Sequence, residues 1–283
     1  MSIGSFNLKH TFESGQPLAF YGDYYEVANR LEYSAGSFPV SLSVRKQRTS
    51  LAVDIESPGT KAARKEVIRR FRLNDDIDRV YDNIGTDKFM HAAISSYRGL
   101  RLTLNDPWET TLCFIISQYN NVKRIRKIVK SILSRFGNPI FDPDGRAVGT
   151  RFPTSAELAR VPLNELVSCG AGFRSRYLKD AAEFCTYNMD LYKINTTYPK
   201  LKARLMEMNG VGEKVADCIA LMGYGKLESF PVDVWVKRTM EKVYFKGKSI
   251  NNGEIREFAS DLWGDYAGYA QQYLFWHGRQ KVV

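Results

Sequence analysis

The chain has 283 residues, of which 44% are hydrophobic and 13% aromatic, and its formal net charge is +10. This composition predicts a globular rather than a disordered chain, long enough for one large or two to three small domains. The net positive charge favours a polyanionic partner, which we expect to be nucleic acid first and an anionic membrane surface second.

The four cysteines are spaced too widely for the common metal centres. They lie 56, 16 and 33 residues apart, without a CxxC or CxxH pair, at Cys113, Cys169, Cys185 and Cys218. We therefore expect free buried thiols in a reducing cytosol, and neither an iron–sulfur cluster nor a structural zinc site. Because no signal peptide or membrane-spanning run is present, we expect an intracellular location, in the cytoplasm or nucleoid.

The first third of the chain alternates apolar and polar residues as a half-buried sheet does. Residues 40–44 and 51–55 each place apolar side chains on one face, and the polar residues 45–49 between them predict a hairpin turn. Residues 19–33 also have a strand-like pattern. The charged stretch 60–71 predicts an amphipathic helix.

Helical periodicity dominates the rest of the chain. Asp106 predicts a helix start, with Pro107 at the first helical position and Glu109 closing a capping box. The apolar spacing carries this helix to near Gly137.

Further along, Thr154 with Glu157 marks another helix start. Residues 166–184 and 198–222 each indicate a helix, a glycine turn and a second helix. The predicted fold is therefore α+β, with a small N-terminal antiparallel β domain followed by a mainly α-helical body.

The second glycine turn, MNGVGEK at residues 208–214, carries the sharpest chemical signal. Gly210 and Gly212 permit a tight turn whose amides form an anion site able to bind a DNA phosphate. Lys214 lies in the first turn of the next helix, where the helix dipole and partial burial disfavour an ammonium. We therefore expect a lowered pKa for Lys214 and an amine that forms a Schiff base. The alternative is that Lys214 pairs with Asp217 or touches phosphate.

A carboxylate follows this lysine by 19 residues. Asp233, in FPVDV, is expected to cap the next helix. Beside Lys214, it would also hold the amine and stabilise an oxocarbenium-like sugar as a base departs, as carboxylates do in glycoside hydrolysis.

Together these motifs resemble the helix-hairpin-helix DNA glycosylases, and most closely the 8-oxoguanine DNA glycosylases. The signature is GVGxKVADCI followed by PVDV, and four further blocks occur in the family's order: SGQPLAF, residues 99–125, GAGFRSRYL and GYAQQYLF. The resemblance implies an N-terminal β-rich domain with a connecting helix over residues 1–98. It implies a helical glycosylase domain over 99–283, with the helix-hairpin-helix at about 201–223.

The resemblance also implies a function in base excision repair on duplex DNA that contains 8-oxoguanine, carried out by a monomer. The damaged guanine leaves the stack for a pocket, because its sugar is inaccessible within the duplex. Lys214 then attacks the sugar C1′ and displaces the base, and the Schiff base permits β-elimination as in an AP lyase. Asp233 would be the acidic partner of Lys214.

The resemblance also implies which residues recognise the base, because their positions match those of the family's base-contacting residues. The Gly15 carbonyl would accept the N7 hydrogen that distinguishes 8-oxoguanine from guanine, and Gln271 would read the Watson–Crick edge. Phe275 and Cys218 would stack on the two faces of the base. Without the resemblance, Gly15 is a simple turn residue, and Phe275 and Cys218 are core residues.

Other positions match residues that contact the duplex. Phe173 would be the wedge between base steps, and Arg174 and Arg124 would contact the estranged cytosine. Tyr119, followed by Asn120, stands where animal and fungal members carry an asparagine that fills the vacated space.

Trp235 replaces a phosphate-contacting histidine of the family. Because Trp235 and Tyr119 both depart from the family's pattern, the resemblance does not imply which base is preferred opposite the lesion. Lys123, Arg126 and Lys127 would add general attraction to the DNA backbone, or form an ordinary solvated helix face. No cofactor is implied, apart from a structural monovalent or calcium ion held by the backbone carbonyls of Met206, Met208 and Val211.

Several alternatives remain. A related glycosylase for other lesions is one, although alkylation-repair relatives generally lack the hairpin lysine and endonuclease-III-like relatives usually carry a four-cysteine cluster. A non-enzymatic helix-hairpin-helix module would bind DNA without turnover. A small-molecule enzyme is disfavoured, because no dinucleotide or triphosphate loop is present.

Overall fold

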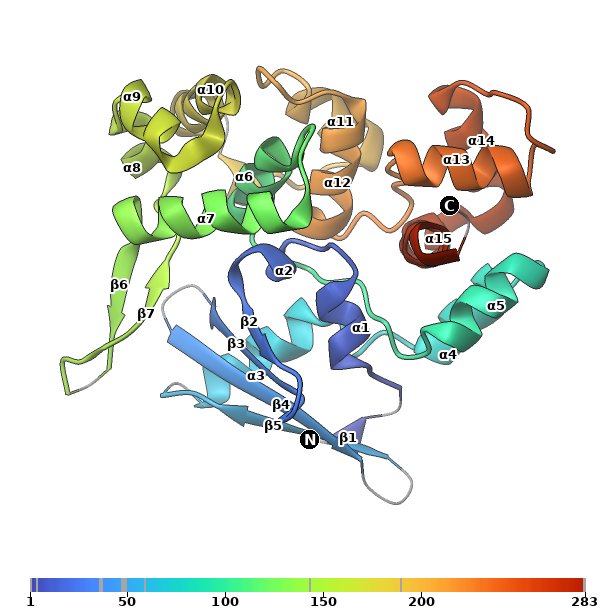
Figure 1. Cartoon of the computed structure of the whole chain (residues 1–283), viewed down its shortest axis with the longest axis horizontal. Helices are drawn as coiled ribbons and strands as arrows, with labels where there is room; N and C mark the ends of the chain where they lie inside the picture. The colour runs from blue at the N-terminus through green and yellow to red at the C-terminus, as the bar shows by residue number, and fades with distance from the viewer. Residues whose placement is uncertain are drawn as a thin grey trace.

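The structure is a computed structural model that describes residues 2–3, 5–35, 38–46, 50–58, 60–142, 144–188 and 190–281. A twisted antiparallel sheet lies on one side of a helical body (Figure 1). The sheet has the strand order β1-β5-β4-β3-β2. Its strands are β1 (Ser2–Ile3), β2 (Asp23–Tyr25), β3 (Arg30–Ala35), β4 (Phe38–Lys46) and β5 (Leu51–Glu56).

The predicted strand alternation of the first third is confirmed. Leu42 of β4 is opposite both Leu31 of β3 and Ile55 of β5, so these apolar side chains share one face of the sheet. Arg45 and Lys46 continue β4, and the rest of the predicted hairpin turn, residues 47–49, lies outside the described residues.

The strand-like interpretation of residues 19–33 is confirmed for β2 and for the start of β3, but residues 19–21 belong to a short helix, and two helices precede β2. They are α1 (Leu8–Glu13) and α2 (Leu18–Tyr21), and every residue of α2 is buried. Pro17 starts the α2 turn, and burial on all sides removes the periodicity by which a short helix is recognised in sequence.

The helical body contains the remaining elements in chain order. The helices of its first half are α3 (Thr60–Arg70), α4 (Ile77–Ile84), α5 (Lys88–Ser96), α6 (Pro107–Ser117), α7 (Val122–Phe136), α8 (Ser155–Arg160), α9 (Leu163–Leu166) and the π turn η1 (Val167–Ala171). A hairpin of β6 (Asn138–Phe141) and β7 (Ala147–Arg151) follows α7. The second half contains α10 (Arg174–Tyr187), η2 (Leu191–Lys193), α11 (Tyr198–Leu205), α12 (Glu213–Tyr224), α13 (Val234–Val243), α14 (Asn252–Trp263), η3 (Gly264–Tyr266) and α15 (Ala267–Lys281).

The single helix predicted from Pro107 to Gly137 is wrong, because the chain breaks between α6 and α7. Tyr119 adopts a left-handed backbone with φ +47°, and Asn121 caps the new helix by accepting a hydrogen bond from the Arg124 amide at 2.9 Å. Apolar residues on both sides of a short break keep the helical spacing, so periodicity alone does not detect it.

The other predicted helix starts are confirmed. Asp106 caps α6 by accepting from the amides of Trp108 and Glu109, and Thr154 with Glu157 forms a complete capping box on α8. Glu109, however, does not close a box on Asp106. Its carboxylate is buried and accepts a hydrogen bond from the Tyr21 hydroxyl at 3.1 Å.

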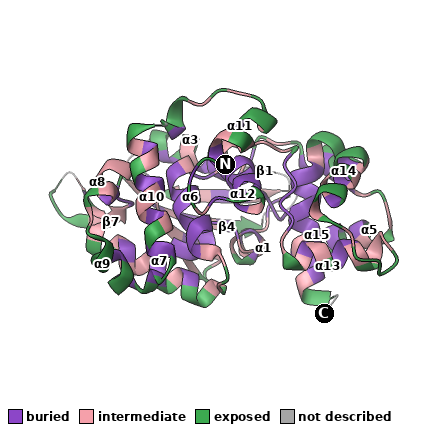
Figure 2. Cartoon of the chain, turned by 90° about the horizontal axis from the view of Figure 1, so that it is seen from above, coloured by how far each residue is buried: buried purple, intermediate pink, exposed green. Residues whose placement is uncertain are grey.

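Both predicted glycine turns between helices are confirmed, and the second one is central to the molecule. Gly170 and Gly172 have positive φ between α9 and α10, and Gly210 has φ +83° between α11 and α12. Helices α6, α12 and α15 are largely buried in the interior (Figure 2). Helix α12 packs on α6, while α15 packs on α4, α5 and α13. In the part of the chain that is described, no helix has the length and apolar character needed to cross a membrane.

Candidate active site

The hairpin between α11 and α12 supplies the first half of the site. A side chain at Gly210 would place its Cβ 2.3 Å from the Tyr177 ring, so only glycine fits this turn. Gly212 is the N-cap of α12, with extended backbone and open space around it. The carbonyl of Gly210 accepts a hydrogen bond from the Gln118 side chain at 2.9 Å, which joins the hairpin to the α6–α7 loop.

Lys214 projects from the first turn of α12 into a partly buried position. Its ammonium lies 5.1 Å from the centroid of the Phe114 ring, a cation–π distance. The thiol of Cys218, one turn further along α12, faces it closely enough to affect its pKa. The amine therefore lies against aromatic and sulfur atoms.

The predicted fall in the pKa of Lys214 is wrong for the DNA-free protein. Burial lowers the pKa, but the facing Cys218 and Asp233 outweigh that effect, and the pKa of Lys214 lies above its usual value. Burial also raises the pKa of the Cys218 thiol to about 11, so at neutral pH the pair is an ammonium beside a neutral thiol. The sequence predicts the nearby carboxylate but not the distance that decides its effect on the pKa of the lysine.

The alternative pairing of Lys214 with Asp217 is also excluded by the geometry. Asp217 is fully buried on another face of α12, where it accepts from the Tyr198 hydroxyl at 2.7 Å and pairs with Lys202 at 3.0 Å. Arg256 of α14 donates to its second oxygen at 2.9 Å. Asp217 therefore ties α11, α12 and α14 together.

Asp233 provides the carboxylate of the site. It caps α13 as predicted, since its Oδ1 accepts from the Val236 amide at 2.8 Å. It also lines the same cavity as Lys214 and is close enough to raise the pKa of that lysine. The hydrogen bond that caps α13 therefore also holds the Asp233 carboxylate in the cavity that Lys214 lines.

All four residues predicted to recognise the base meet in this same cavity, which has a volume of about 60 Å³. It is lined by Ser14, Gly15, Phe114, Lys214, Cys218, Met222, Pro231, Asp233, Gln271, Gln272 and Phe275. Gln271 is 5% exposed, and its Oε1 is buried without a hydrogen-bond partner. A buried acceptor without a partner is costly, so this amide is suited to a ligand that donates.

The segment that carries Gly15 is fixed by two glutamines that the sequence reasoning missed. Gln272 donates to the Ser14 carbonyl at 2.9 Å, and the fully buried Gln16 accepts from the Thr103 amide at 2.7 Å. Gly15 itself has φ +78°, and a Cβ there would lie 3.4 Å from the Phe275 ring. Gln16 belongs to the SGQ block and Gln272 to GYAQQYLF, so the only sequence signal was their place in these motifs.

A wider cleft of 490 Å³ opens beside this cavity. Lys214 and Asp233 line both spaces, and the cleft is bordered by Gln118, Tyr119 and Asn120 on one side and Val234, Trp235 and Lys237 on the other. Tyr119 is 94% exposed. The α6–α7 loop and the start of α13 therefore form the two rims of the catalytic cleft.

Phe173, the predicted wedge, and its neighbour Arg174 differ in their exposure to solvent. Phe173 is 54% exposed at the start of α10, as a wedge requires, whereas Arg174 is only 3% exposed and donates to backbone carbonyls of the α6–α7 loop. Arg124 is exposed near Arg174 and adds to the lowering of its pKa, for which burial is the main cause.

The basic side chains of helix α7 fall into two groups, one exposed to solvent and one bonded to the N-terminal domain. Lys123 and Lys127 are exposed, whereas Arg126 donates to the Ala19 carbonyl at 3.0 Å and pairs with Asp23. Arg126 therefore attaches α7 to the N-terminal domain, and its charge is partly neutralised there.

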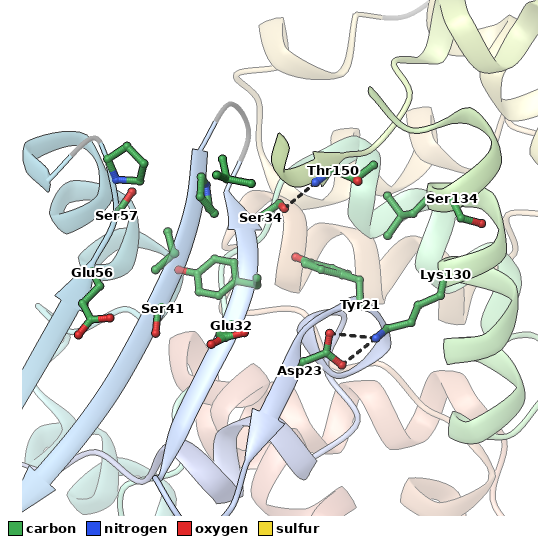
Figure 3. A pocket seen from close by; sticks show the side chains of 16 residues that line it. Tyr21, Asp23, Glu32, Ser34, Ser41, Glu56, Ser57, Lys130, Ser134 and Thr150 are labelled. Atoms are coloured by element: carbon green, nitrogen blue, oxygen red, sulfur yellow. Dashed lines mark hydrogen bonds and ion pairs between the residues drawn. The ribbon is translucent and has the colours of Figure 1, made fainter. Parts of the chain in front are cut away.

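A larger cavity, of 740 Å³, lies elsewhere, between the sheet and α7 (Figure 3). Two pairs of its polar groups bond to each other, since Lys130 donates to Asp23 at 2.7 Å and Ser34 accepts from the Thr150 amide at 3.3 Å, whereas the buried Tyr33 hydroxyl has no partner. None of the predicted catalytic or base-reading residues lines it. The smaller cavity at Lys214 is the better candidate because the predicted catalytic and base-reading residues meet there.

Comparison with known proteins agrees with this geometry. The family described as "HhH-GPD superfamily base excision DNA repair protein" matches residues 112–265, more than half of the chain, and "8-oxoguanine DNA glycosylase, N-terminal domain" matches residues 1–111. The chain belongs to the HhH-GPD superfamily of base excision DNA repair proteins.

Within this superfamily, the chain is similar to members of known name. It is 31% identical to a probable N-glycosylase/DNA lyase of Methanothermobacter thermautotrophicus, over 99% of this chain and 95% of that protein. The structure of MBOgg1 with a low affinity DNA ligand has 33% identity and a TM-score of 0.86, covering 99% and 94% of the two chains. The Clostridium acetobutylicum 8-oxoguanine glycosylase/lyase, bound to DNA with cytosine opposite 8-oxoguanine, has 28% identity and a TM-score of 0.85, covering 98% and 93%.

Proposed function

We propose that this protein is a bifunctional DNA glycosylase and AP lyase that excises 8-oxoguanine from duplex DNA. One observation carries the proposal: a single cavity brings together Lys214, Asp233, Gly15, Gln271 and Phe275 from segments far apart in the chain. An amine nucleophile, a carboxylate and groups able to read a base are what a lyase-competent glycosylase needs at one point. The family and the named relatives support the same conclusion.

The chemistry follows from the two charged groups. The Lys214 amine, once it has lost its proton, attacks the sugar C1′ while the N-glycosidic bond breaks and its electron pair leaves with the base, which takes up a proton. The Asp233 carboxylate stabilises the positive charge that develops on the sugar. Ring opening gives a Schiff base with Lys214, and loss of a C2′ proton then expels the 3′ phosphate in β-elimination.

Base reading follows from the polar edges of the cavity. The Gly15 carbonyl accepts the N7 hydrogen of 8-oxoguanine, and the unpaired Gln271 Oε1 accepts from its Watson–Crick edge. Phe275 and Cys218 cover the two faces. Because a cavity of about 60 Å³ is too small for a purine, its lining has to rearrange when the base enters, and the partly exposed Phe275 ring lies beside Gly15 at this point.

The remaining predicted contacts belong to the same proposal. The amides at Gly210 and Gly212 bind a phosphate, Phe173 enters the base stack, and Tyr119, Asn120, Trp235 and Arg124 border the DNA. A monovalent or calcium ion would bind the carbonyls of Met206, Met208 and Val211, one of which, that of Met208, already accepts from the Val211 amide at 3.0 Å. The protein would act as a monomer, inside the cell, where its DNA substrate is.

Borohydride trapping tests the proposal on a duplex with one 8-oxoguanine opposite cytosine. The parent should form a covalent protein–DNA adduct and Lys214→Gln should form none, while Lys200→Gln, which removes an exposed lysine of α11, should behave like the parent. Alkali-revealed base loss without an adduct would mean a monofunctional glycosylase. Tight binding with neither adduct nor base loss would overturn the substrate and favour another lesion or a binding module.

A further inference from the structure

The lysine of the site lies over the face of an aromatic ring that belongs to another helix. The Lys214 ammonium is 5.1 Å from the centroid of the Phe114 ring, and Phe114 is 5% exposed. The face of an aromatic ring carries partial negative charge, so it attracts a cation and has no comparable attraction for a neutral amine. The contact therefore favours the protonated form of the residue that has to act as the nucleophile.

Close packing of two helices sets the position of this ring. Helix α6, which carries Phe114, is buried over residues 108–116 and packs on α12. The two backbones approach each other at Gly223 of α12, where an added Cβ would lie 3.3 Å from the Pro107 Cα. Because no side chain separates the helices at that point, the distance between the Phe114 ring and Lys214 is set by the backbones of α6 and α12.

The other groups around the amine come from three helices. Cys218 and Asp217 on α12 and Asp233 at the start of α13 all favour the ammonium. Lys237 of α13 lines the adjoining cleft as a second cation. The α15 side chains that line the cavity are uncharged, namely Gln271, Gln272 and Phe275. No ion pair of Lys214 is seen in the part of the chain that the structure describes, so the carboxylates act on the amine from a distance while the ring contacts it directly.

Resting on the proposed function, we infer that Phe114 is a positioning residue for the nucleophile. The face of its ring holds the Lys214 amine as an ammonium beside the base cavity, and this contact has to be given up before the amine attacks the sugar. Weakening the contact should therefore make the nucleophile more available rather than less. A ring that only filled space in the core would have no such effect, because the electron density on its face would not matter.

The test replaces Phe114 with phenylalanines that carry one, two and three ring fluorine atoms, which draw electron density from the face and hardly change the shape. Trace acetylation of the DNA-free protein at pH 8, read by peptide mass spectrometry against the exposed Lys200, measures the neutral fraction of Lys214. Labelling of Lys214 should rise along the series, by about threefold to tenfold with three fluorines, because loss of a cation–π contact lowers the pKa of the lysine by about half a unit to one unit. The same replacements at Phe71, whose ring lies against two other aromatic rings, should leave the labelling unchanged.

Single-turnover excision of 8-oxoguanine opposite cytosine at pH 7 completes the test. Its rate should rise along the Phe114 series by a factor similar to that of the labelling, because only the neutral amine attacks. Labelling that stays constant along the series would overturn the inference, and so would excision that stays constant or falls while the labelling rises. Thermal unfolding of each protein separates these outcomes from a disturbed core. A parent without activity on 8-oxoguanine would instead refute the proposed function, and the labelling series would still decide whether the ring holds the ammonium.

Discussion

Gln272 and Ser14, 258 positions apart in the chain, are joined by one buried hydrogen bond of 2.9 Å from the Gln272 side chain to the Ser14 carbonyl. This bond sets where the next residue, Gly15, presents its backbone to the cavity. On the proposed function, lesion recognition would therefore depend on the position that Gln272 gives to this segment.

Gln272→Leu should weaken the discrimination between 8-oxoguanine and guanine. It leaves the Ser14 carbonyl unpaired, which costs about 1–3 kcal/mol, and it frees Gly15 to shift. Single-turnover excision on the two bases measures the ratio, with the exposed Gln280→Leu of the same helix as control. An unchanged ratio with normal stability would show that Gly15 does not depend on Gln272.

The raised pKa of Lys214 predicts a pH-dependent chemical step. Below that pKa most of the lysine is ammonium and cannot attack, so the single-turnover rate should rise about tenfold per pH unit between about pH 6 and 9. Asp233→Asn removes one of the groups that raise the pKa and should move the rise toward lower pH, while the maximum rate falls. A flat profile in the parent would mean that the proton is lost within the bound complex rather than to solvent.

Glu109 predicts a pH dependence of stability rather than of activity. Burial raises its pKa from 4.5 to about 7 despite the nearby Arg70, so the folded state holds this proton more tightly than the unfolded state does. The contribution is therefore complete below pH 4.5 and is lost as the pH rises through 7. Between these limits the parent should lose roughly 3 kcal/mol relative to Glu109→Gln. Urea unfolding of both proteins at pH 5 and pH 8 measures the difference. An equal change in the free energy of unfolding of the two proteins between these pH values would contradict the prediction.

Asp217 should be a determinant of stability and not of chemistry. Asp217→Asn leaves Lys202 and Arg256 facing each other without their shared carboxylate, and breaking such a buried pair costs about 3–5 kcal/mol. Urea unfolding should show this loss, whereas the folded fraction should still form the borohydride adduct through Lys214. A stable variant that forms no adduct would place Asp217 in the reaction.

The two hairpin glycines should respond differently to alanine. Gly210→Ala forces a Cβ to within 2.3 Å of the Tyr177 ring at φ +83°, so it should cost about 2 kcal/mol or more and weaken DNA binding. Gly212→Ala meets open space at an extended backbone and should keep the stability of the parent. Thermal unfolding together with duplex binding separates the two, and equal losses of stability would contradict the turn geometry.

The main elements could be predicted from the sequence where local rules and packing agree. Asp106, Thr154 and Asp233 cap helices as their side chains require, and the glycine turn at Gly210 joins two helices as expected. The break at Tyr119 escaped prediction because four loop residues do not disturb the apolar spacing on either side.

The sequence predicts which residues line the site, but it does not predict their pKa values. Family motifs located Lys214 and Gln271, and the structure places both on one cavity. The pKa of Lys214 could not be derived from its position in a helix, because the groups that decide it, Cys218 and Asp233, act through distances that only the folded chain defines. Arg174 was likewise named from its motif, while its carbonyl partners depend on the loop that the sequence did not reveal.

The long-range bond between Gln272 and Ser14 also bears on the order of folding. Contacts between distant parts of a chain form late, because the intervening loop must close first. A chain in which α15 had not docked would keep the sequence-local helix pair around Gly210 but would lack Gln271, Gln272 and Phe275 at the cavity. On the proposed function, docking of α15 would therefore be the folding step that completes the pocket for a base.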